Sequence, residues 1–384
     1  MISGLDDVVV AETTLSDVDG QAGRLIIRGY SLDELVGNAT YESMLTLLWA
    51  GLFANTPEPG EMAQQLAQAR QEVFHHLLTA ETALRGQPVF DAVRALVARL
   101  PDGEDLGSAL RLVAAPAVFT SGILRLQRGL APIPPSLELD HASDTLRMLH
   151  DVTPTAEQTS ALDSYWVTAS DHGLNASTFV ARVVASTRAG LASATLAAMG
   201  ALKGPLHGGA PGPVLDALDS IGSAEQASDW LQRALDRGER LMGFGHRIYR
   251  VRDPRADAVK NAIQRLARAG QVDPRRLRLA EAVEAAALEL LARKKPDRPL
   301  QTNLEFYTAL LLEALGFPRE AFTCVFGAAR TVGWIAHARE QALNGRLIRP
   351  QSRYVGPQPP SALSVSSGGA YDAATRSVPR HVVM

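Results

Sequence analysis

The chain has 384 residues, 46% of them hydrophobic and 21% charged, as in an ordinary globular protein. Its formal net charge of −3 argues against a nucleic-acid binder, which would usually be basic over a whole domain. The single cysteine, Cys324, excludes a disulfide within the chain and predicts a reducing compartment. The longest charge-free apolar stretch, 189–202, is too short to span a membrane, and the acidic N-terminus does not resemble a signal peptide. We therefore expect a cytoplasmic protein without nucleic-acid or membrane partners.

Helix-favouring residues dominate the sequence. Alanine, leucine and arginine are abundant and β-branched runs are scarce, which predicts an all-α, mainly helical fold. Two short strands are expected at 8–11 and 24–27, around a polar turn at 16–23. The Pro-, Ser- and Gly-rich C-terminus is expected to form a tail without its own core. Apolar spacing predicts a helix starting at Ser31 and further helices at 41–52, 61–78, 89–100, 106–127, 156–170, 176–202, 224–240, 254–269, 274–292, 303–315 and 321–343.

Three of the nine histidines stand beside glycine in breaks between expected helices. His172 lies in Ser-Asp-His-Gly-Leu-Asn, His207 in Gly-Pro-Leu-His-Gly-Gly, and His246 in Gly-Phe-Gly-His-Arg. Glycine permits backbone conformations that let a ligand approach, and such interruptions are natural places for a site. A helix-end imidazole satisfied by its neighbours is an equal alternative for each. The remaining histidines are expected to be satisfied or solvated: His75, His76, His141, His150, His337 and His381.

Two other kinds of site are not expected. No two of the three histidines share a short ligand spacing and no cysteine pair exists, so the sequence predicts no metal site. The glycine-rich segment 204–212 lacks the Gly-Lys-Ser/Thr ending of a phosphate loop and follows an expected helix rather than a strand. The apolar neighbours of Cys324 predict an inert buried thiol.

Charged side chains of two kinds are candidates for binding and catalysis. Glu305 lies among apolar and aromatic residues in Asn-Leu-Glu-Phe-Tyr; burial would raise its pKa and make it a usable base, whereas exposure would make it an ordinary first-turn glutamate. Guanidinium groups hold carboxylates and phosphates through paired hydrogen bonds, although a solvated charged face is the alternative. The candidate arginines are Arg247, Arg250, Arg252 and Arg255 after His246, with Arg330 and Arg349 further on.

Together and in this order, these segments resemble the citrate synthase family. The similarity runs from the opening Gly-Leu-Asp-Asp-Val-Val at 4–9 to the segment 349–357. It includes the His207 segment, Gly-Phe-Gly-His-Arg-Ile-Tyr-Arg with its following Asp-Pro-Arg, and Gly-Trp-Ile-Ala-His at 333–337. The resemblance implies a mainly helical fold with an active site in a cleft. Its large domain would comprise 1–211 and 319–384, including a tail at 351–384, and its small domain 212–318.

The resemblance also implies an acyltransferase that condenses acetyl-CoA with oxaloacetate and water, giving citrate and CoA. His246 would hydrogen-bond the ketone that is attacked, His207 would stabilise the enol, Glu305 would be the base, and Arg250 would contact CoA phosphate. No metal or other cofactor is implied beyond acetyl-CoA as co-substrate. Oxaloacetate would be bound by His172, His246, Arg255, Arg330 and, from the partner subunit of a homodimer, Arg349.

The sequence departs from the family's usual pattern at two positions. Glu305 stands where aspartate is common, and Gln351 replaces the second arginine of a common Arg-Pro-Arg. Some family members carry glutamate at the first position, so it can act as the base; yet a misplacement of about 1 Å can cost on the order of 100-fold in rate. This leaves a weakly active or inactive paralogue that binds CoA or dicarboxylates as one alternative. The other is a 2-methylcitrate synthase using propionyl-CoA, because one methylene is worth only about 1–3 kcal/mol in a pocket.

Overall fold

The computed structural model describes residues 5, 8–208, 211–246, 248–294, 296 and 300–356. The chain divides into two units, Met1–Ile348 and Arg349–Met384. The described part of the first unit is mainly helical with one small sheet, which confirms the expected fold class. The described part of the second unit, 349–356, has no helix or strand, and the rest of the expected tail lies outside the described residues.

The helix bounds agree with the expected ones within a few residues for most of the chain. Three helices were not expected: α4 (Glu81–Leu84), α7 (His141–His150) and α11 (Pro211–Ile221). Asp140 caps α7 by accepting the Ser143 N–H, and α11 starts at Pro211 in a segment taken for a break. The α-helices are α1 Leu32–Leu35, α2 Tyr41–Trp49, α3 Pro59–Leu78, α4 Glu81–Leu84, α5 Val89–Val97, α6 Leu106–Gln127, α7 His141–His150, α8 Ala156–Ala169, α9 Ala176–Ala185, α10 Leu191–Leu202, α11 Pro211–Ile221, α12 Ala227–Asp236, α13 Pro254–Arg268, α14 Pro274–Lys294, α15 Leu304–Ala314 and α16 Phe322–Asn344, with 3₁₀ turns at Ala224–Gln226 and Arg319–Ala321.

The N-terminal sheet differs from the expected one. Strands β1 (Ser16–Asp19), β2 (Arg24–Ile27) and β3 (Tyr30–Ser31) form an antiparallel sheet in that order. Residues 8–11 form no strand, and half of the expected polar turn is β1, so the turn covers only 20–23. A polar segment can serve as an edge strand because its backbone supplies the pairing, while the partner strand β2 buries its apolar side chains in the core.

The single helix expected at 176–202 is instead two helices, α9 and α10. The break occurs at Gly190, whose φ of +91° is open to glycine and strained for other residues. A side chain there would also collide with Asp102, whose Oδ1 would lie 2.2 Å from a Cβ. Asp102 accepts the N–H groups of Ala192 (2.8 Å) and Ser193 (3.1 Å), so a residue distant in sequence caps α10.

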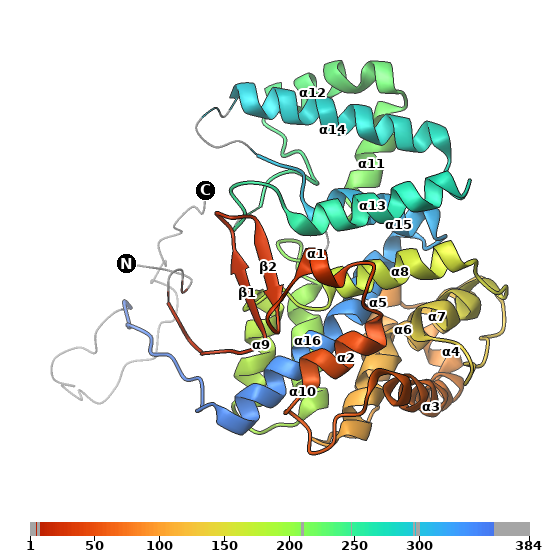
Figure 1. Ribbon diagram of the computed structural model, residues 1–384, viewed down its shortest axis with the longest axis vertical. Helices are drawn as coiled ribbons and strands as arrows, with labels where there is room; N and C mark the ends of the chain where they lie inside the picture. The colour runs from red at the N-terminus through yellow and green to blue at the C-terminus, as the bar shows by residue number, and fades with distance from the viewer. Residues whose placement is uncertain are drawn as a thin grey trace, which may run out of the picture. The chain divides into compact units, whose positions relative to one another are not determined.

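Two long helices, α6 and α16, run through the core. Helix α16 packs against α2, α6, α9 and α10, while α11 to α15 gather at the other end of the first unit (Figure 1). Helix α6 is long and apolar enough to cross a membrane, but nearly all of it is buried inside the protein, as in core helices generally. Cys324 on α16 is buried as expected, and burial raises the pKa of its thiol to about 12. Whether 212–318 acts as a separate domain stays a prediction.

Candidate active site

The glycine-flanked histidines come together where helices end. His172 follows α8, and His246 lies in the loop between α12 and α13. Their rings meet edge to face with centroids 5.6 Å apart, and Tyr249 packs against both rings. The Tyr249 Oη lies 3.2 Å from His172 Nε2. Burial first, then Arg255 and Arg330, lower the pKa of His172 well below its usual value, so this ring is neutral at pH 7.

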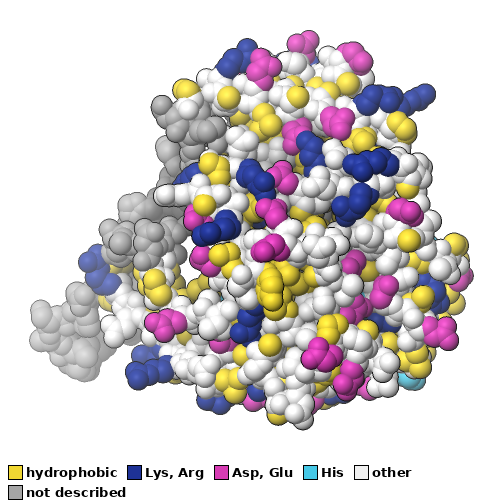
Figure 2. Space-filling model, viewed as in Figure 1, with side chains coloured by type: hydrophobic (Ala, Val, Ile, Leu, Met, Phe, Trp, Pro, Cys, Tyr) yellow, Lys and Arg dark blue, Asp and Glu magenta, His cyan; other side chains and the backbone are white. Residues whose placement is uncertain are grey.

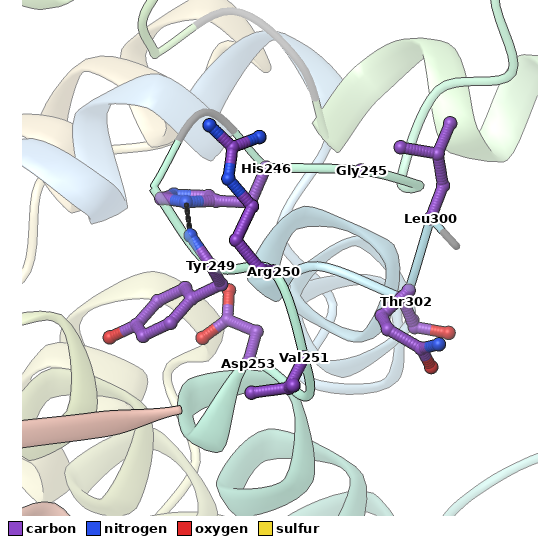
Figure 3. A pocket seen from close by; sticks show the side chains of 9 residues that line it. Gly245, His246, Tyr249, Arg250, Val251, Asp253, Leu300 and Thr302 are labelled. Carbon is purple, nitrogen blue, oxygen red and sulfur yellow. Dashed lines mark hydrogen bonds between the residues drawn. The ribbon is translucent and has the colours of Figure 1, made fainter. Parts of the chain in front are cut away.

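The backbone fixes the tautomer of His246. Its Nδ1 accepts the N–H groups of Ile248 (3.0 Å) and Tyr249 (3.2 Å), the latter drawn as the dashed line in Figure 3. Burial and the neighbouring Arg255 lower the pKa of His246 to about 4, so the ring is neutral at pH 7 with its proton on Nε2. This Nε2 lies 3.0 Å from Arg255 Nη2. In this tautomer Nε2–H cannot accept from Arg255, so two donors face each other without an acceptor between them, and an oxygen that accepts from both would relieve their repulsion.

Two buried arginines give the site its positive charge. Arg255 binds the carboxylate of Asp253 through Nε (3.0 Å) and Nη2 (2.9 Å), and this ion pair raises its pKa despite burial. Arg330 is 1% exposed, and its Nε donates to the Ala169 carbonyl (2.6 Å). Its Nη2 is buried without a hydrogen-bond partner among the described residues. Burial lowers the pKa of Arg330 only to about 10, so it stays charged and presents a free donor to an anion.

The loop that carries His246 also places Glu305. Residues 243–245 pair with 301–303, on the facing segment in Figure 3: Gly245 N–H donates to the Gln301 carbonyl (2.7 Å) and Asn303 N–H to the Gly243 carbonyl (2.9 Å). Asn303 then caps α15 by accepting the Glu305 N–H (3.1 Å). Gly243 has a φ of +87°, and a Cβ there would lie 2.8 Å from the Phe306 side chain. This close approach holds the first turn of α15 against the histidine loop.

Glu305 is half-buried in the first turn of α15. Burial raises the pKa of its carboxyl group, and the positive charges of Arg255 and Arg240 oppose that effect without cancelling it. The condition under which the sequence predicts a usable base is therefore met. A carboxylate with a raised pKa takes a proton more readily than an ordinary exposed one.

Ser177 orients the third histidine, His207. Its hydroxyl accepts the indole N–H of Trp334 (3.1 Å) and lies 2.7 Å from His207 Nε2 and 2.9 Å from Asn175 Oδ1. The hydroxyl has one proton, which can go to the Asn175 oxygen or to His207 Nε2. The Asn175 oxygen keeps the Thr178 N–H as a donor in either case, whereas His207 Nε2 has no other partner among the described residues. We infer that the hydroxyl donates to Nε2, which leaves the proton of His207 on Nδ1. Burial and Arg330 lower the pKa of His207 to about 4, so this donor is uncharged at pH 7.

Not every candidate residue is brought into this cluster. Arg250 is exposed and lines the same pocket as His246, with its side chain extending past that ring (Figure 3). Arg349 belongs to the second unit, and Arg247 lies outside the described residues. The role of each residue stays a prediction.

Most of the other histidines are placed as expected. His337 is buried and satisfied, with Arg182 Nε donating to its Nδ1 (3.0 Å) and its Nε2 facing the Asp171 carboxylate (3.2 Å). His150 lies 2.8 Å from the Leu315 carbonyl. The prediction was wrong for His141, which is buried against aromatic rings with neither ring nitrogen hydrogen-bonded among the described residues. His381 lies outside the described residues.

Three important residues were not found from the sequence. Asp253 could have been found, because it caps α13 two residues before Arg255 and a carboxylate at that distance can reach the arginine. Ser177 was detectable only as a small polar residue in the first turn of a helix, and the many serines of the chain share that property. Tyr249 follows the histidine loop with no local pattern that predicts its contact with His172.

Known proteins with similar sequences and structures belong to one group. A family model described as "Citrate synthase, C-terminal domain" matches residues 4–351. The chain is 37% identical to the "Putative citrate synthase 2" of Mycobacterium tuberculosis, with 95% of each chain covered, and 36% identical to the "Citrate synthase" of Haloferax volcanii, with 92% and 95% covered. It is 35% identical to the "2-methylcitrate synthase" of Mycobacterium tuberculosis, with 92% and 90% covered.

Solved structures give the same result. The citrate synthase of Thermotoga maritima superposes with a TM-score of 0.82 at 32% identity, covering 96% of this chain and all of that one. The citrate synthase of Thermoplasma acidophilum, solved with carboxymethyl coenzyme A and oxaloacetate, superposes with a TM-score of 0.81 at 26% identity, covering 95% and 99%. The fold is thus that of citrate synthases, one of which was solved with small-molecule ligands bound.

The tautomers can be measured directly. Long-range ¹H–¹⁵N correlation spectra should show His207 and His246 as neutral rings from about pH 5.5 to pH 8, because both pKa values are about 4. The proton should reside on Nδ1 in His207 and on Nε2 in His246. Assignment would use the His207→Gln and His246→Gln variants. A titration midpoint near the ordinary value of about 6.5 for either ring, or the opposite tautomer, would contradict this description of the site.

Proposed function

Because the chain belongs to the citrate synthase family, an acyltransferase-type family, we propose that it condenses acetyl-CoA with oxaloacetate and water to give citrate and CoA. One observation carries this proposal: two buried arginines lie beside neutral histidines and a carboxylate of raised pKa, and one of them, Arg330, has a donor without a partner among the described residues. Oxaloacetate is a dianion, which needs positive charge, and its ketone needs a hydrogen-bond donor to become a good electrophile. The acetyl group of acetyl-CoA is a weak carbon acid, which needs a base.

Oxaloacetate would occupy the space between the arginines and the histidine pair. Arg255 and Arg330 would each receive a carboxylate, which fits the free Nη2 of Arg330. His172, neutral and buried, would add a hydrogen bond without adding charge. The ketone oxygen would accept from His246 Nε2–H, and this polarises the carbon that is to be attacked.

Acetyl-CoA would lose a methyl proton to Glu305. The thioester oxygen would accept the Nδ1–H of His207 as negative charge develops on it, so the enol forms next to a donor already in place. The enol carbon then bonds to the ketone carbon, whose oxygen takes up a proton to become the hydroxyl of the product. Water finally attacks the thioester, the C–S bond breaks, and CoA leaves as the thiol while the acyl carbon becomes a carboxyl group.

The CoA moiety would lie against the segment 212–318. Arg250 is exposed beside His246 and can reach a phosphate. A mostly apolar pocket of about 240 Å³ is lined mainly by α11, α12 and the segment 239–244, together with Phe306, the residue after Glu305. The face visible in Figure 2 mixes Lys and Arg with Asp and Glu and shows no continuous basic area.

A homodimer would complete the site. Helix α9 leaves Phe179, Val180 and Val183 half-buried although they are apolar, which favours a second copy packing on this face. Arg349 would then bind oxaloacetate in the partner's site, as the family resemblance implies.

The similarity to known enzymes does not decide whether the acyl substrate is acetyl-CoA or propionyl-CoA. The relatives named citrate synthase and 2-methylcitrate synthase are almost equally similar to this chain, at 36–37% and 35% identity. A thiol-release assay with oxaloacetate and either acetyl-CoA or propionyl-CoA, each over a concentration series, decides between them. We expect a higher kcat/KM for acetyl-CoA, by about 10- to 200-fold if the pocket discriminates by one methylene. Preference for propionyl-CoA would make the protein a 2-methylcitrate synthase, and release with neither would contradict the proposed function.

The role of Glu305 is tested by two substitutions. Glu305→Gln should lower kcat by at least about 100-fold because the base is lost, while oxaloacetate affinity measured by calorimetry stays within a few-fold. Glu305→Asp keeps the carboxylate but withdraws it by one methylene, and should retain partial activity. In the native enzyme kcat/KM should fall as pH decreases, with a midpoint above the ordinary glutamate value of about 4.3, since only the ionised base works and its pKa is raised. Full activity of Glu305→Gln would refute the assignment.

Subunit mixing tests the role of Arg349. Arg349→Ala and Glu305→Gln are each expected to be nearly inactive alone. In a mixed dimer one site carries both substitutions and the other carries neither, if Arg349 serves the partner's site. Equal refolded mixtures should then recover about a quarter of native activity, from half the dimers with one intact site each. No recovery would show that Arg349 acts within its own subunit or not at all.

A further inference from the structure

The N-terminal hairpin β1–β2 contacts the His172 loop at one end. The Ser16 hydroxyl donates to the Asp171 carboxylate and accepts the Gly173 N–H (3.1 Å). It therefore holds the residues on both sides of His172. The Asp171 carboxylate is fixed from the opposite direction by His337 Nε2 (3.2 Å). Nothing in the chemistry of the proposed reaction requires Ser16, so its two contacts need another explanation.

The other end of β1 contacts the His246 loop. The Gly20 carbonyl accepts the Arg250 N–H (2.8 Å), and a Cβ on Gly20 would lie 2.3 Å from the Ile248 carbonyl oxygen. Gly23, at φ +63°, leaves no room either, because a Cβ there would lie 2.8 Å from the Val251 side chain. In Figure 1 the tip of the hairpin lies beside the loop that precedes α13. Ile248 supplies one of the two N–H groups that fix the His246 tautomer.

We propose that this hairpin is a spacer that sets the separation of the His172 and His246 loops, with Ser16 and Gly20 as its positioning residues. A strand rises about 3.3 Å per residue, so the two anchors lie about 13 Å apart on a single extended segment. Pairing with β2 stiffens that segment, with Ser16 opposite Ile27 and Asp19 opposite Arg24. Neither residue touches the reacting atoms. Their role in catalysis rests on the proposed function, in which both histidines bind oxaloacetate.

Spacing matters because both loops must contact one small molecule. His172 and His246 belong to separate segments of the chain. If one ring moves by about 1 Å relative to the other, the rate or affinity that depends on both falls steeply. Loops between helices are otherwise the most mobile part of such a fold. A stiff strand anchored at both ends restricts each loop relative to the other, so loss of one anchor should release both.

Ser16→Ala tests the first anchor. It removes both hydrogen bonds, and we expect KM for oxaloacetate to rise about tenfold while KM for the acyl-CoA stays within about twofold. Ser16→Thr retains the hydroxyl and should restore the native KM. Gly20→Ala tests the second anchor, and should lower kcat and raise KM for oxaloacetate. Gly60→Ala is the matched control, because a Cβ at Gly60 meets open space and should change neither constant.

Coupling between the anchors distinguishes a spacer from two local contacts. In the double variant Ser16→Ala/Gly20→Ala, the combined loss in kcat/KM should be clearly smaller than the product of the single losses, since either change already frees both loops. Multiplicative effects would overturn the proposal, as would a native KM for oxaloacetate in Ser16→Ala.

A measurement without substrate separates this proposal from the proposed function. Amide hydrogen exchange should become faster at residues 171–173 in Gly20→Ala and at residue 250 in Ser16→Ala, but at neither place in Gly60→Ala. Unchanged exchange at the far anchor in both variants would refute the spacer even if the enzyme is active. Native protein that neither binds nor converts oxaloacetate would refute the proposed function, while the exchange data would still decide the spacer.

Discussion

Two buried guanidinium groups, Arg255 and Arg330, set the conditions for everything else in the site. Removing a charge from water costs several kcal/mol even after relaxation, so a folded protein retains such a group only with compensation. Arg255 is compensated by the carboxylate of Asp253. Arg330 is compensated in part by the Ala169 carbonyl and by the charge of Asp171, and its Nη2 has no partner in the part of the chain that the structure describes. The site is thus left short of negative charge, which a dianionic ligand would supply.

The same positive charge determines how the histidines work. Burial and the two arginines keep all three rings uncharged at neutral pH, so in the proposed reaction they would act as neutral hydrogen-bonding groups rather than as charged acids. Separate networks orient them: backbone N–H groups for His246, and Ser177 with Trp334 for His207. A charged imidazole beside two guanidiniums would add to the cost of the empty site. Neutral rings with fixed tautomers provide polarisation without that cost.

The sequence predicts the helices well where local pattern decides them, as with α6, whose bounds agree to the residue. It also identifies the three histidines, because chain breakers beside a polar side chain are a local signal. It fails where a distant residue decides. The break between α9 and α10 depends on Asp102 filling the space at Gly190, and β1 is a strand only because β2 pairs with it. Ser16, Ser177 and Tyr249 gain their importance from contacts with residues 30 to 157 positions away, which no local pattern records.

Oxaloacetate binding to an Arg330→Gln variant tests the account most directly. The free donor of Arg330 is the clearest sign that an anion belongs in the site, and losing one partner of a buried charge pair typically costs about 2–5 kcal/mol, or roughly 30- to 4000-fold in affinity. Thermal unfolding with and without oxaloacetate reports both sides of the balance. The account predicts that the variant alone is about as stable as the native protein, because a buried charge that is only partly compensated has been removed, and that oxaloacetate no longer stabilises it. A variant stabilised by oxaloacetate as strongly as the native protein would contradict the account.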